Sequence, residues 1–66
     1  MNEAYQASDL ANQFSFIALR AGKREAHLTA MIQHNAARDL HLAAGNLNSY
    51  EGHAKAASLH YRAAGF

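Results

Sequence analysis

Apolar residues recur at intervals of three and four along most of the 66-residue chain, and no proline interrupts them. This spacing gathers apolar side chains on one side of an α-helix, whereas the residues on one face of a strand are two apart. Alanine, the residue that most favours a helix, is abundant throughout. The sequence therefore predicts an all-α protein folded as a single helical domain over residues 1–66.

Glycine and asparagine mark the expected helix ends. A first helix ends near Ala21, a second runs over about residues 23–44, and a third runs over about residues 49–64. Gly45 stands where the glycine after a helix C-terminus is common. Asn48 is the expected N-cap of the third helix.

The start of the first helix has two candidate caps, Asn2 and Ser8, because short polar side chains accept hydrogen bonds from free backbone N–H groups. The expected core stripes are formed by apolar residues at helical spacing. In the first helix the stripe comprises Leu10, Phe14, Ile17 and Ala21; in the second it comprises Leu28, Ile32, Ala36 and Ala43, with Ala26, Ala30, Ala37, Leu40 and Ala44 beside it.

Gly22 leaves two architectures open. A break there gives a small antiparallel three-helix bundle, which is the preferred interpretation. However, the stripe of the first segment continues in phase into Leu28 and Ile32, and a glycine inside a helix costs only about 1 kcal/mol relative to alanine. An unbroken helix would give a long-short helical hairpin that pairs with another copy.

Self-association is expected with either architecture. A chain of 66 residues buries a modest core, and the absence of cysteine removes disulfides as a means of stabilising it. Phe16 and Leu19 lie on a different side of the first helix from Phe14, so this helix is apolar on more than one face. The predicted oligomer interface comprises Leu10, Phe14, Phe16, Ile17 and Leu19.

The five histidines follow a seven-residue spacing, with three in the second helix and two in the third. In an antiparallel hairpin, residues at equal height have position numbers with a constant sum. His41 with His53 and His34 with His60 both sum to 94, so two cross-helix pairs are expected about 10.5 Å apart. His27 is left beyond the end of the third helix. The same register also aligns Asp39 with Lys55.

Three roles are open for these aligned histidines, which we call the histidine seam. Neutral imidazole binds zinc, other transition metals and heme iron, and the candidate ligands are His34, His41, His53 and His60. Two histidines seven apart in one helix cannot share an ion, so a four-histidine zinc site needs two copies of the chain. Alternatively the rings are half-buried packing residues, or they make an interface that loosens when protonation places like charges together.

Charge and composition disfavour several other functions. The formal net charge is +1, which gives no strong field for nucleic acid. The basic residues Arg20, Lys23 and Arg24 are therefore interpreted as a solvated turn in preference to a nucleic-acid contact. No apolar run approaches the roughly 20 residues of a membrane span, and no secretion signal starts the chain. A cytoplasmic protein without a membrane partner is expected.

The sequence gives no sign of catalysis. No glycine-rich phosphate loop is present, and the candidate acids and nucleophiles show no nucleophile–base pattern. The predicted function is that of a small non-enzymatic interaction, inhibitor or adaptor module. It acts as a homodimer or higher oligomer, needs no cofactor and also binds another protein. The alternative is a metal- or heme-binding protein that uses the histidine seam.

Overall fold

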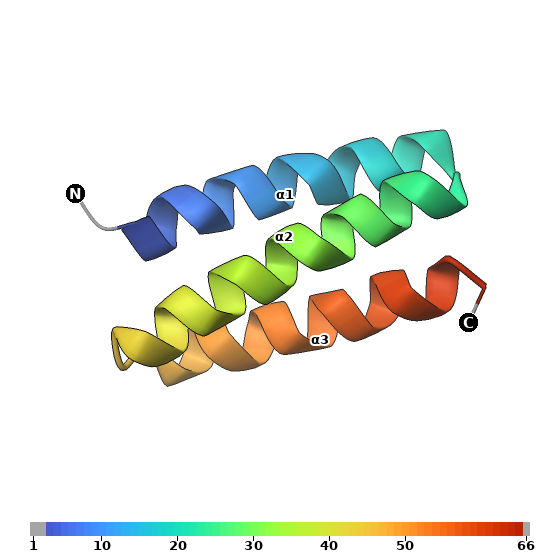
Figure 1. The fold of residues 1–66 in the computed structure, drawn as a ribbon. Coiled ribbons are helices and arrows are strands. Elements are labelled where there is room, and N and C mark those ends of the chain that lie inside the picture. Colours follow the sequence, from blue (N-terminus) through green and yellow to red (C-terminus); the bar gives the residue numbers. More distant parts are fainter. Residues whose placement is uncertain (1–2, 66) are drawn as a thin grey trace.

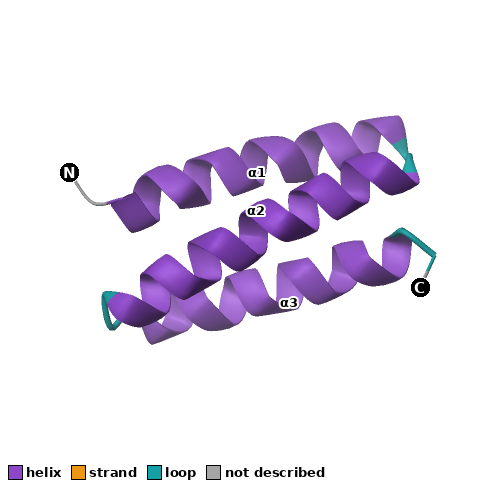
Figure 2. Cartoon of the chain, in the orientation of Figure 1, coloured by secondary structure: helices purple, strands orange, loops and turns teal. Residues whose placement is uncertain are grey.

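The computed structural model describes residues 3–65, which form three helices in an up-down-up arrangement (Figure 1). They are α1 (Glu3–Ala21), α2 (Arg24–Ala43) and α3 (Leu47–Ala63). No strand occurs within this part of the chain (Figure 2). The all-α prediction is confirmed, and the break between the first two helices excludes the long-short hairpin.

Both turns depend on a glycine in the left-handed region of backbone space. Gly22 has a φ of 64°, and its N–H donates to the carbonyl of Ala18 at 2.8 Å. Gly45 has a φ of 80°, and the following Asn46 N–H donates back to the carbonyl of His41 at 2.8 Å. Since residues with a Cβ are disfavoured at such φ values, these two glycines decide where α1 and α2 end.

The third helix begins earlier than predicted. Asn46, and not Asn48, occupies the N-cap position, and its carbonyl accepts the N–H of Tyr50 at 3.0 Å. The Asn46 side chain makes no capping hydrogen bond, because its amide is turned towards His41. Asn48 lies inside α3, so its predicted role is wrong.

The predicted caps of the first helix also need correction. Ser8 lies well inside α1, and its hydroxyl contacts histidines of the other two helices, so it is not a cap. Asn2 lies outside the described residues.

Helix α2 is the central element of the layer. It packs against both α1 and α3, whereas within residues 3–65 no Cα atom of α1 comes within 8 Å of one in α3. The molecule measures 32 × 20 × 13 Å. The α1–α3 side of the bundle is therefore joined by side chains and not by close backbone packing.

The core consists of small and polar residues. Of the predicted core stripes only Ala30 and Ala37 are buried, and the prediction is wrong for the large apolar residues. Ile17 is 53% exposed and Ile32 is 58% exposed. In α1 and α2 the buried stripe lies beside the predicted one, where alanines allow close approach and the polar side chains bond to one another. The buried residues are Ala4, Ala11, Ala18, Ala30, Ala37, Ala57 and Ala64, together with His27, His34, His41, His53 and His60.

None of the described helices combines the length and the apolar character that a bilayer crossing requires.

Candidate functional site

A continuous line of hydrogen-bonded side chains runs along the interior of the bundle. It contains all five histidines of the sequence and connects all three helices. We call it the histidine–serine chain. Its members, in bonded order, are Asn46, His41, Ser8, His53, His34, Ser15, His60 and His27.

The first half of the histidine–serine chain begins at the α2–α3 turn. The amide nitrogen Nδ2 of Asn46 lies 3.2 Å from Nδ1 of His41. On the other side of this ring, Nε2 of His41 lies 2.6 Å from Oγ of Ser8. The same oxygen lies 2.8 Å from Nε2 of His53. Ser8 of α1 therefore bridges a histidine of α2 and a histidine of α3.

The second half repeats this pattern one heptad further along. Nδ1 of His53 and Nδ1 of His34 are 2.8 Å apart. Nε2 of His34 then lies 2.5 Å from Oγ of Ser15, which is 2.7 Å from Nε2 of His60. The last bond joins Nδ1 of His60 to Nδ1 of His27 at 2.8 Å. The two serines thus join α1 to α3 across the side where the backbones stay apart.

The histidine rings stack in the pairs that the helix register predicts, and further hydrogen bonds join one pair to the next. His41 stacks with His53 at 5.5 Å between centroids, and His34 stacks with His60 at 5.7 Å. The direct nitrogen–nitrogen bonds, however, run diagonally between these levels. The register predicts that His27 is left beyond the third helix. His27 is instead joined to α3, because the diagonal bond brings Nδ1 of His60 to Nδ1 of His27.

Spacing explains why the sequence builds this line. Each helix presents one stripe with alternating steps of three and four, which keeps the residues on one face. Sequence reasoning missed Ser8 and Ser15, and the signal that would have found them was their seven-residue spacing, equal to that of the histidines. The stripes are Ala4, Ser8, Ala11, Ser15 and Ala18 in α1; His27, Ala30, His34, Ala37 and His41 in α2; and His53, Ala57, His60 and Ala64 in α3.

Burial keeps the central histidines neutral. Desolvation, with smaller contributions from His53 and His60, lowers the pKa of His34 from 6.5 to about 4. Desolvation followed by the charge of His41 lowers the pKa of His53, and desolvation followed by the charge of His27 lowers the pKa of His60. At neutral pH these three rings are therefore uncharged, which suits them to donate one hydrogen bond and accept another.

The predicted metal ligands His34, His41, His53 and His60 all belong to this line. Among the described residues, no group of three or more histidine or acidic side chains has a geometry that would hold a metal ion. Both ring nitrogens of each of the four histidines are already engaged in hydrogen bonds. A metal would therefore have to replace part of the histidine–serine chain.

The predicted interface residues lie on α1 and point mostly to the outside. Leu10 is 43% exposed, Phe16 60% and Leu19 74%. Ile17 is also exposed, and Phe14 is half-buried. We call these five residues, which lie on more than one side of α1, the α1 apolar face.

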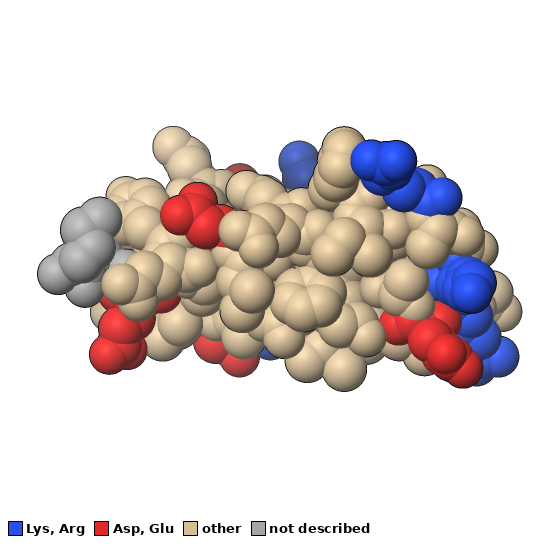
Figure 3. Space-filling model, turned by 90° about the horizontal axis from the view of Figure 1, so that it is seen from above, with Lys and Arg blue, Asp and Glu red and all other residues tan. Residues whose placement is uncertain are grey.

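Charges lie at the two ends of this face. Seen from above α1, the surface has acidic side chains towards one end, basic side chains with acidic ones beside them towards the other, and is largely uncharged between them (Figure 3). The guanidinium of Arg20 lies 5.5 Å from the centre of the Phe16 ring. Arg20, Lys23 and Arg24, the predicted basic cluster, are exposed around the α1–α2 turn.

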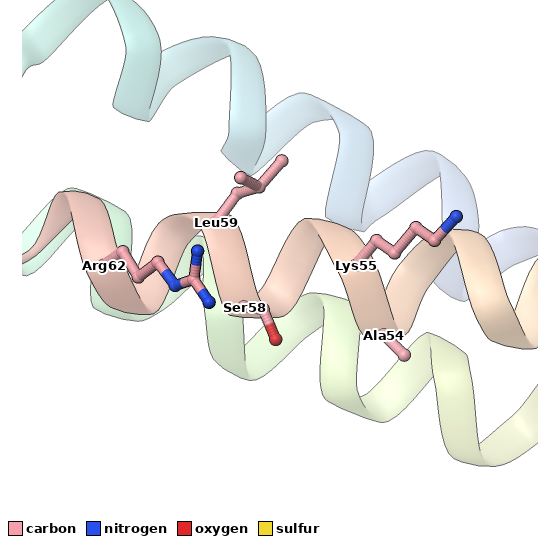
Figure 4. A pocket seen from close by; sticks show the side chains of 5 residues that line it. All are labelled: Ala54, Lys55, Ser58, Leu59 and Arg62. Carbon is pink, nitrogen blue, oxygen red and sulfur yellow. The ribbon is translucent and has the colours of Figure 1, made fainter.

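A shallow depression on α3 is a weaker candidate site (Figure 4). It lies on one helix, contains none of the histidines, and is open to solvent. Its lining residues are Ala54, Lys55, Ser58, Leu59 and Arg62. Nor does Lys55 anchor the register, because Asp39 pairs instead with Arg38 at 2.8 Å.

No protein-family model, no curated protein and no solved structure matches this chain.

Proposed function

We propose that the protein is a non-enzymatic interaction module that pairs with a second copy of itself through the α1 apolar face. The observation that carries this proposal is the inverted placement of side chains. Phe16, Ile17 and Leu19 are more than half exposed, while the core positions of the same helix are alanine and serine. A helix that only had to cover its own bundle would place its large apolar residues inwards.

The energetics favour pairing. Burying a large apolar side chain contributes about 1.5–3 kcal/mol, and the α1 apolar face has three such side chains that are at least half exposed. The interior of a single copy gains little from its alanines, since each offers only a methyl group. A second copy supplies the apolar contact that the fold itself lacks.

Charge determines the orientation of the two copies. Glu3 and Asp9 lie towards the start of α1. Arg20 lies at its end, Lys23 lies in the following turn and Arg24 is the first residue of α2. In a two-fold symmetric pair with antiparallel α1 helices, the acidic end of one copy meets the basic end of the other. Asp9 and Arg20 are equidistant from position 14.5, which lies within the α1 apolar face.

Sedimentation equilibrium of untagged protein tests the surface. Leu19→Gln and Phe16→Gln are expected to shift the chain towards monomer by at least tenfold in Kd, with the helix content preserved. Ile32→Gln is the matched control, because Ile32 is 58% exposed on α2. A wild-type monomer at all concentrations, or equal effects of all three variants, contradicts the proposal.

A charge exchange tests the orientation. Asp9→Lys and Arg20→Glu are each expected to weaken the pair, because each places like charges together, and the double variant is expected to restore it. Failure of the double variant to recover excludes the antiparallel arrangement.

Native mass spectrometry of the same samples reads the oligomer and any bound metal together. A stoichiometric metal that is lost in His34→Ala would support the histidine metal site as the function instead.

A further inference from the structure

The hydrogen bond at Asn46 gives the histidine–serine chain a direction. A neutral imidazole has one N–H group, which donates, and one nitrogen lone pair, which accepts. Nδ2 of Asn46 can only donate, so Nδ1 of His41 is the acceptor of their bond. The proton of His41 is therefore on Nε2, from which it donates to Ser8.

The direction of the Asn46–His41 bond fixes the donor and the acceptor of every later hydrogen bond. Since Ser8 accepts from His41, its hydroxyl donates to Nε2 of His53. The proton of His53 is then on Nδ1 and is donated to His34. The same steps through Ser15 assign the remaining rings. With all rings neutral, the histidines of α2 (His27, His34 and His41) carry Nε2–H, and those of α3 (His53 and His60) carry Nδ1–H.

The far end of the histidine–serine chain reaches solvent. Nδ1 of His27 accepts from His60, and its Nε2–H has no partner among the hydrogen bonds of the described residues. His27 is 7% exposed. His41, by contrast, is 0% exposed beneath Asn46.

We propose that the histidine–serine chain is a two-state proton relay that couples the orientation of the Asn46 amide to the protonated nitrogen of His27. His27 and His41 are 14 positions apart in α2, a distance of about 21 Å along the helix. In one state Nε2 of His27 presents a donor to solvent, and in the reversed state it presents an acceptor. This inference goes beyond self-association and does not depend on it.

Reversal leaves the net charge unchanged. When the Asn46 amide turns away, a hydronium ion or buffer acid delivers a proton to Nδ1 of His41. Six transfers follow within the chain: Nε2 of His41 to Ser8, Ser8 to Nε2 of His53, Nδ1 of His53 to His34, Nε2 of His34 to Ser15, Ser15 to Nε2 of His60, and Nδ1 of His60 to His27. Nε2 of His27 then gives one proton to water. Every ring ends neutral in its other tautomer, and Asn46 turns its Oδ1 towards the new Nδ1–H of His41.

The surroundings of the rings do not trap the proton on the way. The titratable groups that face His41 are Tyr5 of α1, whose ring lies edge-on at 5.3 Å, and His53 of α3. His34 faces His53 and His60. No aspartate or glutamate of the described residues forms an ion pair with a histidine. The two states of the relay therefore differ chiefly at the two ends of the histidine–serine chain. The orientation of the Asn46 amide selects between them.

Asn46→Asp tests the direction, because a carboxylate can only accept and an aspartate still suits the N-cap position. Imidazole ¹⁵N chemical shifts near pH 8 report the protonated nitrogen of each ring. In the wild type we expect Nε2–H on the three α2 histidines and Nδ1–H on the two α3 histidines. In Asn46→Asp the pattern inverts at all five rings, while the control Asn48→Asp adds the same charge on exposed α3 surface and leaves the pattern unchanged. One common tautomer in the wild type, or an unchanged pattern in Asn46→Asp, overturns the proposal.

Variants at Ser15 test whether the tautomer change passes along the histidine–serine chain. In Asn46→Asp combined with Ser15→Ala, we expect His41, His53 and His34 to invert, while His60 and His27 no longer respond to residue 46. Ser15→Thr keeps a hydroxyl and is expected to restore inversion at all five rings. If His27 still inverts without the Ser15 hydroxyl, the coupling does not pass through the chain and the relay is wrong. Should Ser15→Ala not fold, the response of His27 to Asn46→Asp alone decides.

Discussion

Nδ1 of His34 and Nδ1 of His53 lie 2.8 Å apart at the centre of the bundle. At this distance one nitrogen must carry the proton and the other must offer a lone pair. A second proton would point two N–H groups at each other and would place two positive rings in a buried position. The fold is therefore built around neutral histidines, and its stability depends on their remaining neutral.

Acid is expected to unfold the protein at pH values where carboxylate-based proteins remain stable. The folded-state pKa values of His34, His53 and His60 are lowered, that of His34 from 6.5 to about 4. The unfolded chain therefore binds protons that the folded chain does not, so stability is complete above pH 6.5 and falls as the pH drops below it, for His34 down to about pH 4. Each such ring contributes a slope of at most about 1.4 kcal/mol per pH unit.

Urea unfolding between pH 8 and pH 4.5 measures this slope. His34→Gln is expected to reduce it, because the side chain with the most strongly lowered pKa is gone. A free energy of unfolding that stays constant from pH 7 to pH 5 contradicts the neutral-core interpretation.

Removal of a bridging hydroxyl is expected to destabilise the bundle. Ser8→Ala leaves Nε2 of His41 and Nε2 of His53 without their shared partner. An unsatisfied buried polar group costs about 1–3 kcal/mol, so we expect a loss in this range or above it, measured by urea unfolding at pH 7.5. Ser58→Ala on exposed α3 surface is the control and is expected to change stability by less than about 0.5 kcal/mol. Equal stabilities of the two variants would show that water replaces the Ser8 hydroxyl.

Gly45 and Gly52 are expected to respond oppositely to substitution by alanine. Gly45 has a φ of 80°, where a Cβ is strained although nothing lies within 4 Å of it. Gly45→Ala should therefore cost about 1–2 kcal/mol. Gly52 lies inside α3 with open space around its Cα, so Gly52→Ala should stabilise by about 0.5–1 kcal/mol. Thermal unfolding of both variants gives the sign of each change in stability. Two changes of the same sign would contradict the left-handed backbone at Gly45 or the helical backbone at Gly52.

The sequence predicts the elements of this fold better than their faces. Spacing and glycine placement are local properties, so they give the three helices and the turns at Gly22 and Gly45. The choice of the buried face is not local. Leu10, Phe14 and Ile17 have the stronger apolar signal in α1, yet Ala4, Ala11 and Ala18 are buried, because the partners of Ser8 and Ser15 are on other helices.

The histidine–serine chain can be predicted from the sequence only in part, because its geometry is likewise not a local property. Heptad spacing and helix register correctly place His41 beside His53 and His34 beside His60. The diagonal bonds and the bridging serines require the relative rotation and tilt of three helices, which position numbers do not contain. Asn46 is the clearest case, since its position is typical of a helix cap but its amide binds His41.

In α2 a small residue is buried and a large apolar residue faces solvent, and this placement can be tested by substitution. Ala37 is 0% exposed and Ile32 is 58% exposed, both in α2. Ala37→Leu forces a large side chain between closely packed helices and is expected to cost about 1–3 kcal/mol. Ile32→Ala removes apolar surface that already faces solvent and replaces a β-branched residue by a better helix former, so stability should change by less than about 0.5 kcal/mol. Urea unfolding at low protein concentration, where self-association does not contribute, compares the two. A conventional core built on the Leu28 and Ile32 stripe requires the opposite order, a large loss for Ile32→Ala and tolerance of Ala37→Leu, and that result would overturn the arrangement of side chains described above.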